Sequence, residues 1–315
     1  MSSPVLVTGG AGFAGGHLIE HLSGPGRAAG PIVAWARSDP PEAVAAMATW
    51  IRVDLLDRDH VRREIAQLRP QRIFHCAGAP HVGASFHNSA EPLRSNALAT
   101  HYLLDAARRA GVACRVLVSG SATVYAPSSS PLREDDDVRP TSPYGLSKLA
   151  QEQVGLDVLA GDGLDVIVTR SFNHTGPRQE ASFAAPGFAR QIALIERGAV
   201  EPVLRVGNVD TIRDIMDVRD TVRAYALLMD RGRPGTVYNV ASGVGQSIRR
   251  LLDALVSRSK VPVTIVVDAD RLRPQDTPVL VGDPSRLHGA TGWVPAISFD
   301  RMIDDLLAYW RGHAV

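Results

Sequence analysis

The sequence predicts an α/β fold: a doubly wound parallel sheet followed by a smaller α/β region. Two observations support this prediction. Short apolar runs alternate with stretches of helical periodicity through the first half of the chain, and strands that alternate with helices form a parallel sheet covered on both faces. After Arg170 the pattern loosens into short helices between Gly- and Pro-containing loops. We therefore expect a sheet domain in residues 1–170. Residues 171–315 should form mainly a second domain, with some segments returning to the first.

The expected elements follow in order along the chain. PVLVT is a strand and FAGGHLIEHL its helix; PIVAWA and WIRVD are strands, and DHVRREIAQL is a helix. RIFHCAG and RVLVS are strands separated by a long helix from about Pro92 to Arg109. A further helix follows Tyr144, DVIVTR near Leu164 to Arg170 is a strand, and PGFARQIALIERG is a helix in the second half.

Composition excludes several classes of protein. The 315 residues are 45% hydrophobic and carry a formal net charge of +1, which argues against a nucleic-acid or membrane partner. Cys76 and Cys114 both lie in apolar segments and read as buried thiols, with no disulfide framework or metal cluster. No apolar run is long enough to span a bilayer, and we expect a cytoplasmic protein. The acidic run in APSSSPLREDDDVRPTSP reads as a solvated loop.

A glycine-rich turn in TGGAGFAGGHL joins the first strand to the first helix. Glycines at this spacing let the backbone turn tightly and approach a pyrophosphate, which the helix N-terminus then attracts. Between a first strand and a first helix, the motif predicts a dinucleotide-binding Rossmann sheet. The residues expected at the cofactor are Gly9, Gly12, Phe13, Ala14 and Gly15.

The end of the second strand bears on which dinucleotide binds. An acidic residue there would accept the ribose 2′-hydroxyl of NAD, but the sequence has Ala36, then Arg37 and Ser38. Because an arginine can pair with a 2′-phosphate, Arg37 favours NADP. The alternative is NAD, with Arg37 a surface residue and Asp39 the acid in a shifted register.

Two further strand ends complete the predicted cofactor site. Asp54 and Leu55 follow the third strand, where a carboxylate and an apolar side chain would lie near the adenine. The turn His75 to Gly78 ends the next strand with small residues, of which Ala77 is expected to lie against the cofactor. His75 itself is expected to be a core residue.

The ordered set of glycines, Asn96, Ser121, Tyr144 and Lys148 resembles the extended short-chain dehydrogenase/reductase family over essentially the whole chain. Tyr144 and Lys148, one helical turn apart, face the same way. We expect the lysine to lower the pKa of the tyrosine, so that the phenol exchanges a proton with a sugar hydroxyl or ketone while a nicotinamide moves a hydride. The resemblance implies that Ser121 holds the same oxygen and that Asn96, Tyr144 and Lys148 belong to the cofactor site.

The residues after Ser121 bear on the reaction. Dehydratases of this family carry a glutamate two places after the catalytic hydroxyl, where this sequence has Thr123. Elimination then lacks a base, so a dehydratase is rejected, and Thr123 is expected to contact substrate.

Segments of the second half, among them RSFNHTGPRQ and TGWVPAISF, resemble reductases of GDP-4-keto-6-deoxy-D-mannose and related GDP-mannose 4,6-dehydratases. By analogy Asn173, Arg213 and Arg273 contact the sugar, pyrophosphate or ribose of a GDP-linked substrate. Arg178 stands where these reductases often have glycine, and Arg205 faces either the nucleotide or solvent. The alternative for Arg213 and Arg273 is an ion pair with Asp214 and Asp276.

Three functions stay open at this point. The string SATVY is similar to that of UDP-galactose 4-epimerases, which keep NAD bound, whereas Arg37 and the second half favour the NADPH-dependent reductase. A catalytically silent dinucleotide-binding protein is the third. The resemblance also implies a homodimer through a four-helix contact of the helices after Pro92 and Tyr144. Their apolar residues could equally be core, for example Leu103, Leu104, Leu149 and Val154.

Overall fold

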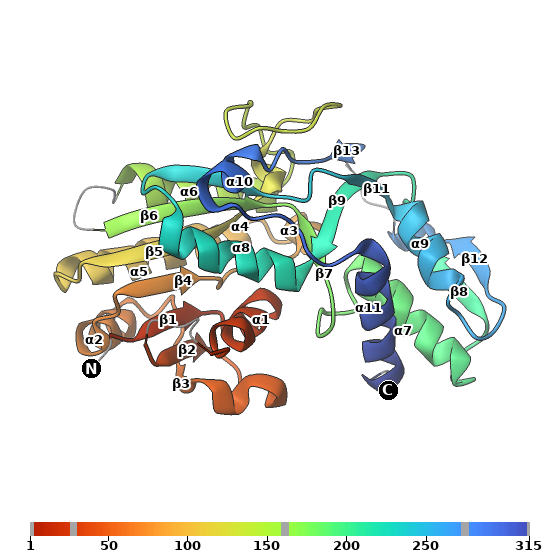
Figure 1. Cartoon of the computed structure of the whole chain (residues 1–315), viewed down its shortest axis with the longest axis horizontal. Coiled ribbons are helices and arrows are strands. Elements are labelled where there is room, and N and C mark those ends of the chain that lie inside the picture. The colour runs from red at the N-terminus through yellow and green to blue at the C-terminus, as the bar shows by residue number, and fades with distance from the viewer. Residues whose placement is uncertain (1–2, 26–29, 159–163, 272–276, 314–315) are drawn as a thin grey trace.

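The computed structural model describes residues 3–25, 30–158, 164–271 and 277–313. A seven-stranded parallel sheet lies at the centre of the larger lobe (Figure 1), in the order β3-β2-β1-β4-β5-β6-β10. Its strands are β1 (Val5–Thr8), β2 (Ile32–Ala36), β3 (Thr49–Arg52), β4 (Arg72–His75), β5 (Cys114–Ser121), β6 (Leu164–Ser171) and β10 (Thr236–Val240). The predicted doubly wound fold is confirmed, and the strand order reverses between β1 and β4.

Helices cover both faces of this sheet, which explains why its inner strands are apolar throughout. All four residues of β1 are buried, because alternate side chains enter opposite cores. Val5 and Val7 belong to one core and Leu6 to the other. The first core lies under α1 (Phe13–Leu22), α8 (Val218–Arg231) and α10 (Ser285–Thr291), and the second under α2 (Arg58–Leu68) and α5 (Ala99–Arg109).

The expected long helix between strands β4 and β5 is present, but it is not uniform. A short turn, α4 (Ala90–Pro92), leads into the π-helical η2 (Leu93–Leu98) and then into α5. A π-helical segment inside an α-helix often marks a functional position. Asn96 lies within this segment.

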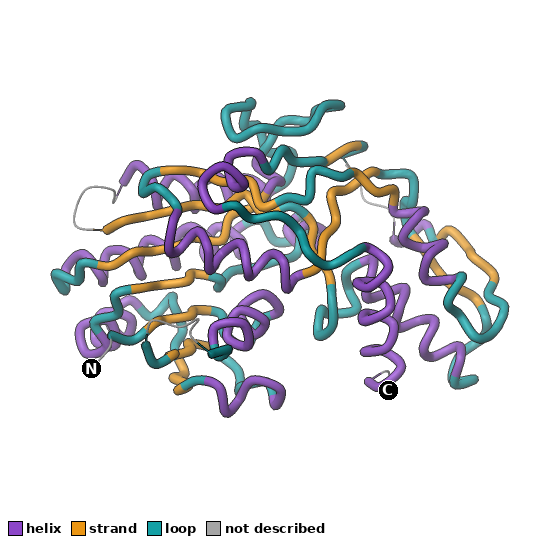
Figure 2. The backbone as a smooth tube through the Cα atoms, in the orientation of Figure 1, coloured by secondary structure: helices purple, strands orange, loops and turns teal. Residues whose placement is uncertain are grey.

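The smaller lobe stands beside the sheet (Figures 1 and 2) and has a core of its own. That core packs α7 (Ala184–Glu196), α9 (Ile248–Val256) and α11 (Phe299–His313) around β8 (Val203–Val206), which pairs with β12 (Thr264–Val267). A second small sheet joins the lobes through β7 (Asn173–Thr175), β9 (Ile212–Asp217), β11 (Gly245–Ser247) and β13 (Val279–Leu280). Segments after residue 170, namely α8, β10 and α10, return to the larger lobe.

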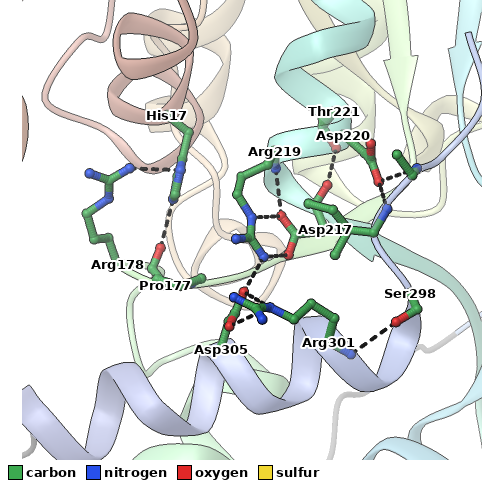
Figure 3. A network of polar contacts seen from close by, with 12 residues as sticks. His17, Pro177, Arg178, Asp217, Arg219, Asp220, Thr221, Ser298, Arg301 and Asp305 are labelled. Atoms are coloured by element: carbon green, nitrogen blue, oxygen red, sulfur yellow. Dashed lines mark hydrogen bonds and ion pairs between the residues drawn. The ribbon is translucent and has the colours of Figure 1, made fainter. Parts of the chain in front are cut away.

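Polar contacts hold the two lobes together where β9 passes into α8 (Figure 3). Asp217 caps α8 by accepting from the Arg219 amide, and its carboxylate also binds the Arg219 guanidinium. The same guanidinium donates to Asp305 of α11 at 2.7 Å. Asp217 is fully buried, so the pairing offsets the cost of removing its charge from water.

Two expectations are tested by the burial of side chains. The acidic run is not entirely solvated: Asp135 is exposed, but Glu134 is buried and accepts from the backbone amide of Asn239 at 2.8 Å. That prediction was therefore wrong for Glu134, because β10 brings a backbone donor to it from far along the chain.

The cysteines are free, Cys114 buried and Cys76 partly so. None of the helices in the described segments combines the length and apolarity needed to cross a membrane.

Candidate active site

The glycine-rich turn lies where the strand order reverses, against the turn that follows β4. Gly9 has a left-handed φ of 69°, and a Cβ there would lie 2.7 Å from the Cα of Ala77. A Cβ on Gly15 would lie 2.1 Å from the carbonyl oxygen of Gly9. Neither position can hold a larger residue without moving backbone, so the two glycines are required by the close approach of chain segments.

The glycine-rich turn and the start of α1 form a site that fits the pyrophosphate of a dinucleotide. Helix α1 begins at Phe13, and its N-cap, Gly12, provides no side-chain hydrogen bond to the first-turn amides. Those amides and the helix dipole therefore remain available to an anion. Phe13 and Ala14 form the first turn and are partly exposed. The site lies at the carboxyl ends of the strands, at the point between β1 and β4 where the strand order reverses. Open parallel sheets bind nucleotides at this point.

The residues expected at the adenosine end also follow strands of this edge. Strand β2 ends at Ala36, so Arg37 is the first residue beyond it, and its side chain is exposed together with Ser38 and Asp39. After β3, Asp54 is exposed and accepts from the amide of Leu56, while Leu55 is buried. The structure thus brings Arg37 and Asp54 to neighbouring strand ends, since β2 pairs with β3.

Ser121 and Tyr144 meet at the end of β5. Ser121 is the last residue of that strand, and its Oγ lies 3.0 Å from Thr123 Oγ1 and accepts from the Thr123 amide. Tyr144 stands in the first turn of α6 (Pro143–Gln153), a helix capped by Ser142. Its backbone amide donates to Ser85 Oγ at 3.2 Å. The Tyr144 phenol is hydrogen-bonded to Ser121, so the two hydroxyl groups lie together.

The expected lowering of the Tyr144 pKa was wrong for this arrangement. Burial raises the pKa of Tyr144 to about 12, and this effect exceeds the opposing hydrogen bond to Ser121. The Lys148 ammonium donates elsewhere, to the Ser119 carbonyl and the Gln151 side chain, both at 2.9 Å. Burial also lowers the pKa of Lys148 to about 8. The phenol therefore keeps its proton at neutral pH.

Asn96 joins three parts of the site. Its Oδ1 accepts from the Ala79 amide at 2.9 Å, and its Nδ2 donates to Ser147 Oγ at 2.8 Å. The side chain is fully buried, and a Cβ on Gly78 would lie 2.3 Å from Asn96 Oδ1. Asn96 thus fixes the turn after β4 against α6. His75 is a core residue, as expected: it is fully buried and lies 2.7 Å from both Thr8 Oγ1 and Thr100 Oγ1.

The residues expected on the substrate side are spread over the junction between lobes. Asn173 is exposed at the start of β7, and Arg205 is exposed on β8, away from Tyr144 in the fold. Arg213 is buried on β9 and donates to the Ile212 carbonyl, whereas Asp214 accepts from backbone amides of the 242–243 turn. Arg273, with Asp276, lies outside the described residues.

Arg178 contacts the cofactor helix rather than an open surface (Figure 3). Its guanidinium lies 2.8 Å from His17 Nδ1 and also pairs with Glu20, both on α1. The other ring nitrogen of His17 bonds the Pro177 carbonyl at 2.9 Å. Arg178 has a left-handed φ of 71°, which a glycine adopts without strain. This backbone conformation would suit the glycine that the resemblance leads us to expect at this position.

Sequence reasoning missed three polar residues of the site: Ser85, Ser147 and Gln151. Ser147 and Gln151 are fully buried and Ser85 nearly so. A helical wheel of the Tyr144 helix would have placed Ser147 near Tyr144 and Gln151 near Lys148. Ser85 has no such signal, because it ends the short helix α3 (Val82–Ser85), whose place is set by tertiary contacts.

The fold and the site define a class. A glycine-rich turn at the switch point of a parallel sheet, with Ser121, Tyr144 and Lys148 at the adjacent strand end, is the arrangement of NAD(P)-dependent oxidoreductases of the extended short-chain dehydrogenase/reductase type. Comparison with known proteins narrows the class. The family model described as GDP-mannose 4,6 dehydratase matches residues 6–306, and the chain belongs to that family.

Relatives within the family differ in activity. The chain is 36% identical to GDP-6-deoxy-D-mannose reductase of Pseudomonas aeruginosa, over 99% of this chain and 98% of the relative. It is 34% identical to UDP-glucose 4-epimerase of Azospirillum brasilense, over 93% and 88% of the two chains. Among solved structures, that of RMD from Pseudomonas aeruginosa complexed with NADPH superposes with a TM-score of 0.86 at 33% identity, covering 99% of each chain.

Proposed function

We propose that this protein reduces the 4-keto group of a nucleotide-activated 4-keto-6-deoxyhexose, with GDP-4-keto-6-deoxy-D-mannose as substrate, GDP-D-rhamnose as product and NADPH as reductant. The observation that carries the proposal is the meeting of Ser121, at the end of β5, with the phenol of Tyr144, in the first turn of α6. Thr123, which has no carboxylate, lies beside Ser121. Full-length similarity to a GDP-6-deoxy-D-mannose reductase supports the choice of sugar nucleotide.

Each residue of the site has its own role in the proposed reduction. A bound nicotinamide cofactor supplies the hydride. Ser121 donates a hydrogen bond to the keto oxygen, and Tyr144 gives its proton to the same oxygen as negative charge develops there. Lys148, one turn further along α6, contributes to the cofactor site. Arg213 of β9, and Arg273 by analogy, hold the diphosphate.

Ser121, Tyr144 and Lys148 suit an epimerase as well as a reductase. Arg37 and the full-length similarity to a GDP-6-deoxy-D-mannose reductase favour reduction. The SATVY segment and the epimerase relative favour the 4-epimerase with tightly bound NAD as the second candidate.

One assay separates these functions. The purified protein is given NADPH and GDP-4-keto-6-deoxymannose, and NADPH absorbance is followed. Consumption of NADPH with formation of GDP-rhamnose is the expected result. Interconversion of UDP-glucose and UDP-galactose without added cofactor would establish the epimerase and reject the reductase. Tight cofactor binding with neither reaction would leave a silent dinucleotide-binding protein.

We further propose the assignment of functions to regions: residues 1–170 bind the dinucleotide and carry the catalytic pair, and residues 171–315 mainly bind the sugar nucleotide, in a cytoplasmic homodimer. The apolar surface of the helices after Pro92 and Tyr144 supports the dimer. Leu103 and Leu104 cannot contribute, because both are fully buried in the core of one chain. Exposed apolar side chains on these helices are instead Leu93, Leu98 and Leu146.

A further inference from the structure

Gln151 lies on the same face of α6 as Lys148 and binds the ammonium directly. Lys148 Nζ donates to Gln151 Oε1 at 2.9 Å. At the other end of the carboxamide, Gln151 Nε2 donates to Thr100 Oγ1 of α5, also at 2.9 Å. Both Gln151 and Thr100 are fully buried. The amide therefore connects the lysine of α6 to a fixed point on the neighbouring helix.

The chemistry of the partners determines which way each group points. An ammonium can only donate, so the carbonyl oxygen of Gln151 must face it. The Thr100 hydroxyl gives its single proton to the Asn96 carbonyl at 2.6 Å, and therefore accepts from Gln151 Nε2 and from His75 Nε2, 2.7 Å away. The other ring nitrogen of His75 then accepts from Thr8 Oγ1 at 2.7 Å. With an ammonium at one end and an accepting hydroxyl at the other, the amide has a single orientation.

The other titratable groups around Lys148 are neutral or already paired. Burial is the main cause of each pKa shift: to about 3 for His75 and to about 12 for Cys76 and Tyr144, with the pKa of Tyr225 raised as well. Glu152, the next residue of α6 after Gln151, is bound by the Arg170 guanidinium at 2.6 and 2.9 Å. The elements that supply these groups are β4 (His75) and the turn after it (Cys76), α6 (Tyr144, Glu152) and α8 (Tyr225).

From this arrangement we propose that Gln151 is a positioning residue for Lys148. Its carbonyl oxygen, held by Thr100, fixes the place of the ammonium beside the Tyr144 turn and supports its charged form. The consequence for turnover rests on the proposed function, but the effect on Lys148 itself does not. An amide suits this task because it accepts from the ammonium without adding a charge that would bind it too strongly.

The composition of the chain makes a direct test possible. Of its 34 basic side chains only two are lysines, Lys148 and Lys260. Protein grown with isotope-labelled lysine gives two side-chain signals in nuclear magnetic resonance, and Lys260 serves as the internal reference. The two signals are titrated in the wild type, in Gln151→Glu and in Gln151→Met.

The two substitutions should move the Lys148 titration in opposite directions. A carboxylate at position 151 favours the ammonium, and the pKa of Lys148 should rise by about one to three units. Methionine has a similar volume but offers no comparable acceptor, so the pKa should fall by about one unit. In the proposed reduction, the pH profile of kcat should shift in the same two directions. Lys260 should titrate as in the wild type in both variants.

Gln153 provides the matched control, because it lies two residues further along α6 and is exposed. Gln153→Glu and Gln153→Met should leave the Lys148 titration unchanged. If folded Gln151→Met shows the wild-type titration of Lys148, the proposal is overturned, whatever the behaviour of Gln151→Glu. Opposite shifts without any keto-sugar reduction would keep the role of Gln151 and reject the proposed function instead.

Discussion

Tyr144 and Lys148 show how a short motif acquires its chemistry from its surroundings. The sequence places the two residues one helical turn apart, but the lysine binds Ser119 and Gln151, and burial decides the pKa of the phenol. A tyrosine that keeps its proton at neutral pH is prepared to act as an acid. The scarcity of lysine elsewhere in the chain fits this role, since a compact ammonium with a shiftable pKa cannot be replaced by arginine.

The phenol can be tested by Tyr144→Phe. Without the acid, kcat for keto-sugar reduction should fall by about a hundred- to ten-thousand-fold. Dinucleotide affinity, measured by calorimetry, should change little, because the glycine turn of α1 is untouched. Turnover close to that of the wild type would contradict proton donation by Tyr144.

The prediction that NADP is preferred to NAD depends on Arg37. Arg37→Ala should raise the Michaelis constant for NADPH by about ten- to a hundred-fold, as expected for a lost charge-assisted contact to a phosphate. The constant for NADH should stay near its wild-type value. Arg109→Ala, at the opposite edge of the sheet at the end of α5, is the control. Equal effects on the two cofactors would show that Arg37 does not bind the 2′-phosphate.

At the scale of elements, α6 has two tasks. Its buried side presents Tyr144, Ser147, Lys148 and Gln151 to the site, whereas Leu146 on the other side is 52% exposed. Helix α6 packs against η2, which adds the exposed Leu93 and Leu98. An apolar surface on a helix pair next to the active site is typical of an interface between protein chains.

The dimer is tested by Leu146→Glu. Light scattering should give twice the chain mass of 33.7 kDa for the wild type and the mass of one chain for the variant, because a charge at the centre of an apolar interface is not solvated. Val294→Glu, at an exposed apolar residue before α11, is the control and should remain dimeric. A wild type with the mass of one chain would reject the interface.

At the scale of the whole molecule, two buried histidines make the stability of the folded state depend on pH. Burial lowers the pKa of His17 to about 4 and that of His75 to about 3. In the unfolded chain both titrate near 6.5, so below that pH the unfolded state binds protons that the folded state does not. The contribution of the two histidines to the free energy of unfolding is therefore fully present above about pH 6.5. It is lost as the pH is lowered toward 4.

The histidine effect should appear in chemical denaturation at a series of pH values. Each of the two histidines should contribute a slope of about 1.4 kcal/mol per pH unit between their unfolded and folded pKa values. In His17→Gln the amide can still bond Pro177 and Arg178, but it cannot take up a proton. The pH slope of the free energy of unfolding should therefore fall by the contribution of one histidine. His87→Gln, at an exposed residue, should leave the slope as in the wild type. An unchanged slope in His17→Gln would contradict the assignment.

Much of the fold and part of the site could be predicted from local pattern. Apolar runs and helical periodicity are local properties, so the strands, the glycine turn and the order of the catalytic residues were readable in advance. Glu134 and Arg178 were not, because their partners, Asn239 and the residues of α1, lie more than a hundred positions away. Leu103 and Leu104 were ambiguous for a related reason: an apolar helix residue looks the same whether it faces its own core or a partner chain.

The sequence by itself determined the doubly wound sheet, the glycine-rich dinucleotide turn and the one-turn spacing of Tyr144 and Lys148, since backbone periodicity and glycine spacing act over a few residues. Only the tertiary structure decided the surroundings of the Tyr144 phenol, the partners of Lys148 and the place of Arg178. These depend on burial and on hydrogen bonds between elements far apart in the chain, and a residue's pKa follows from what surrounds it in space.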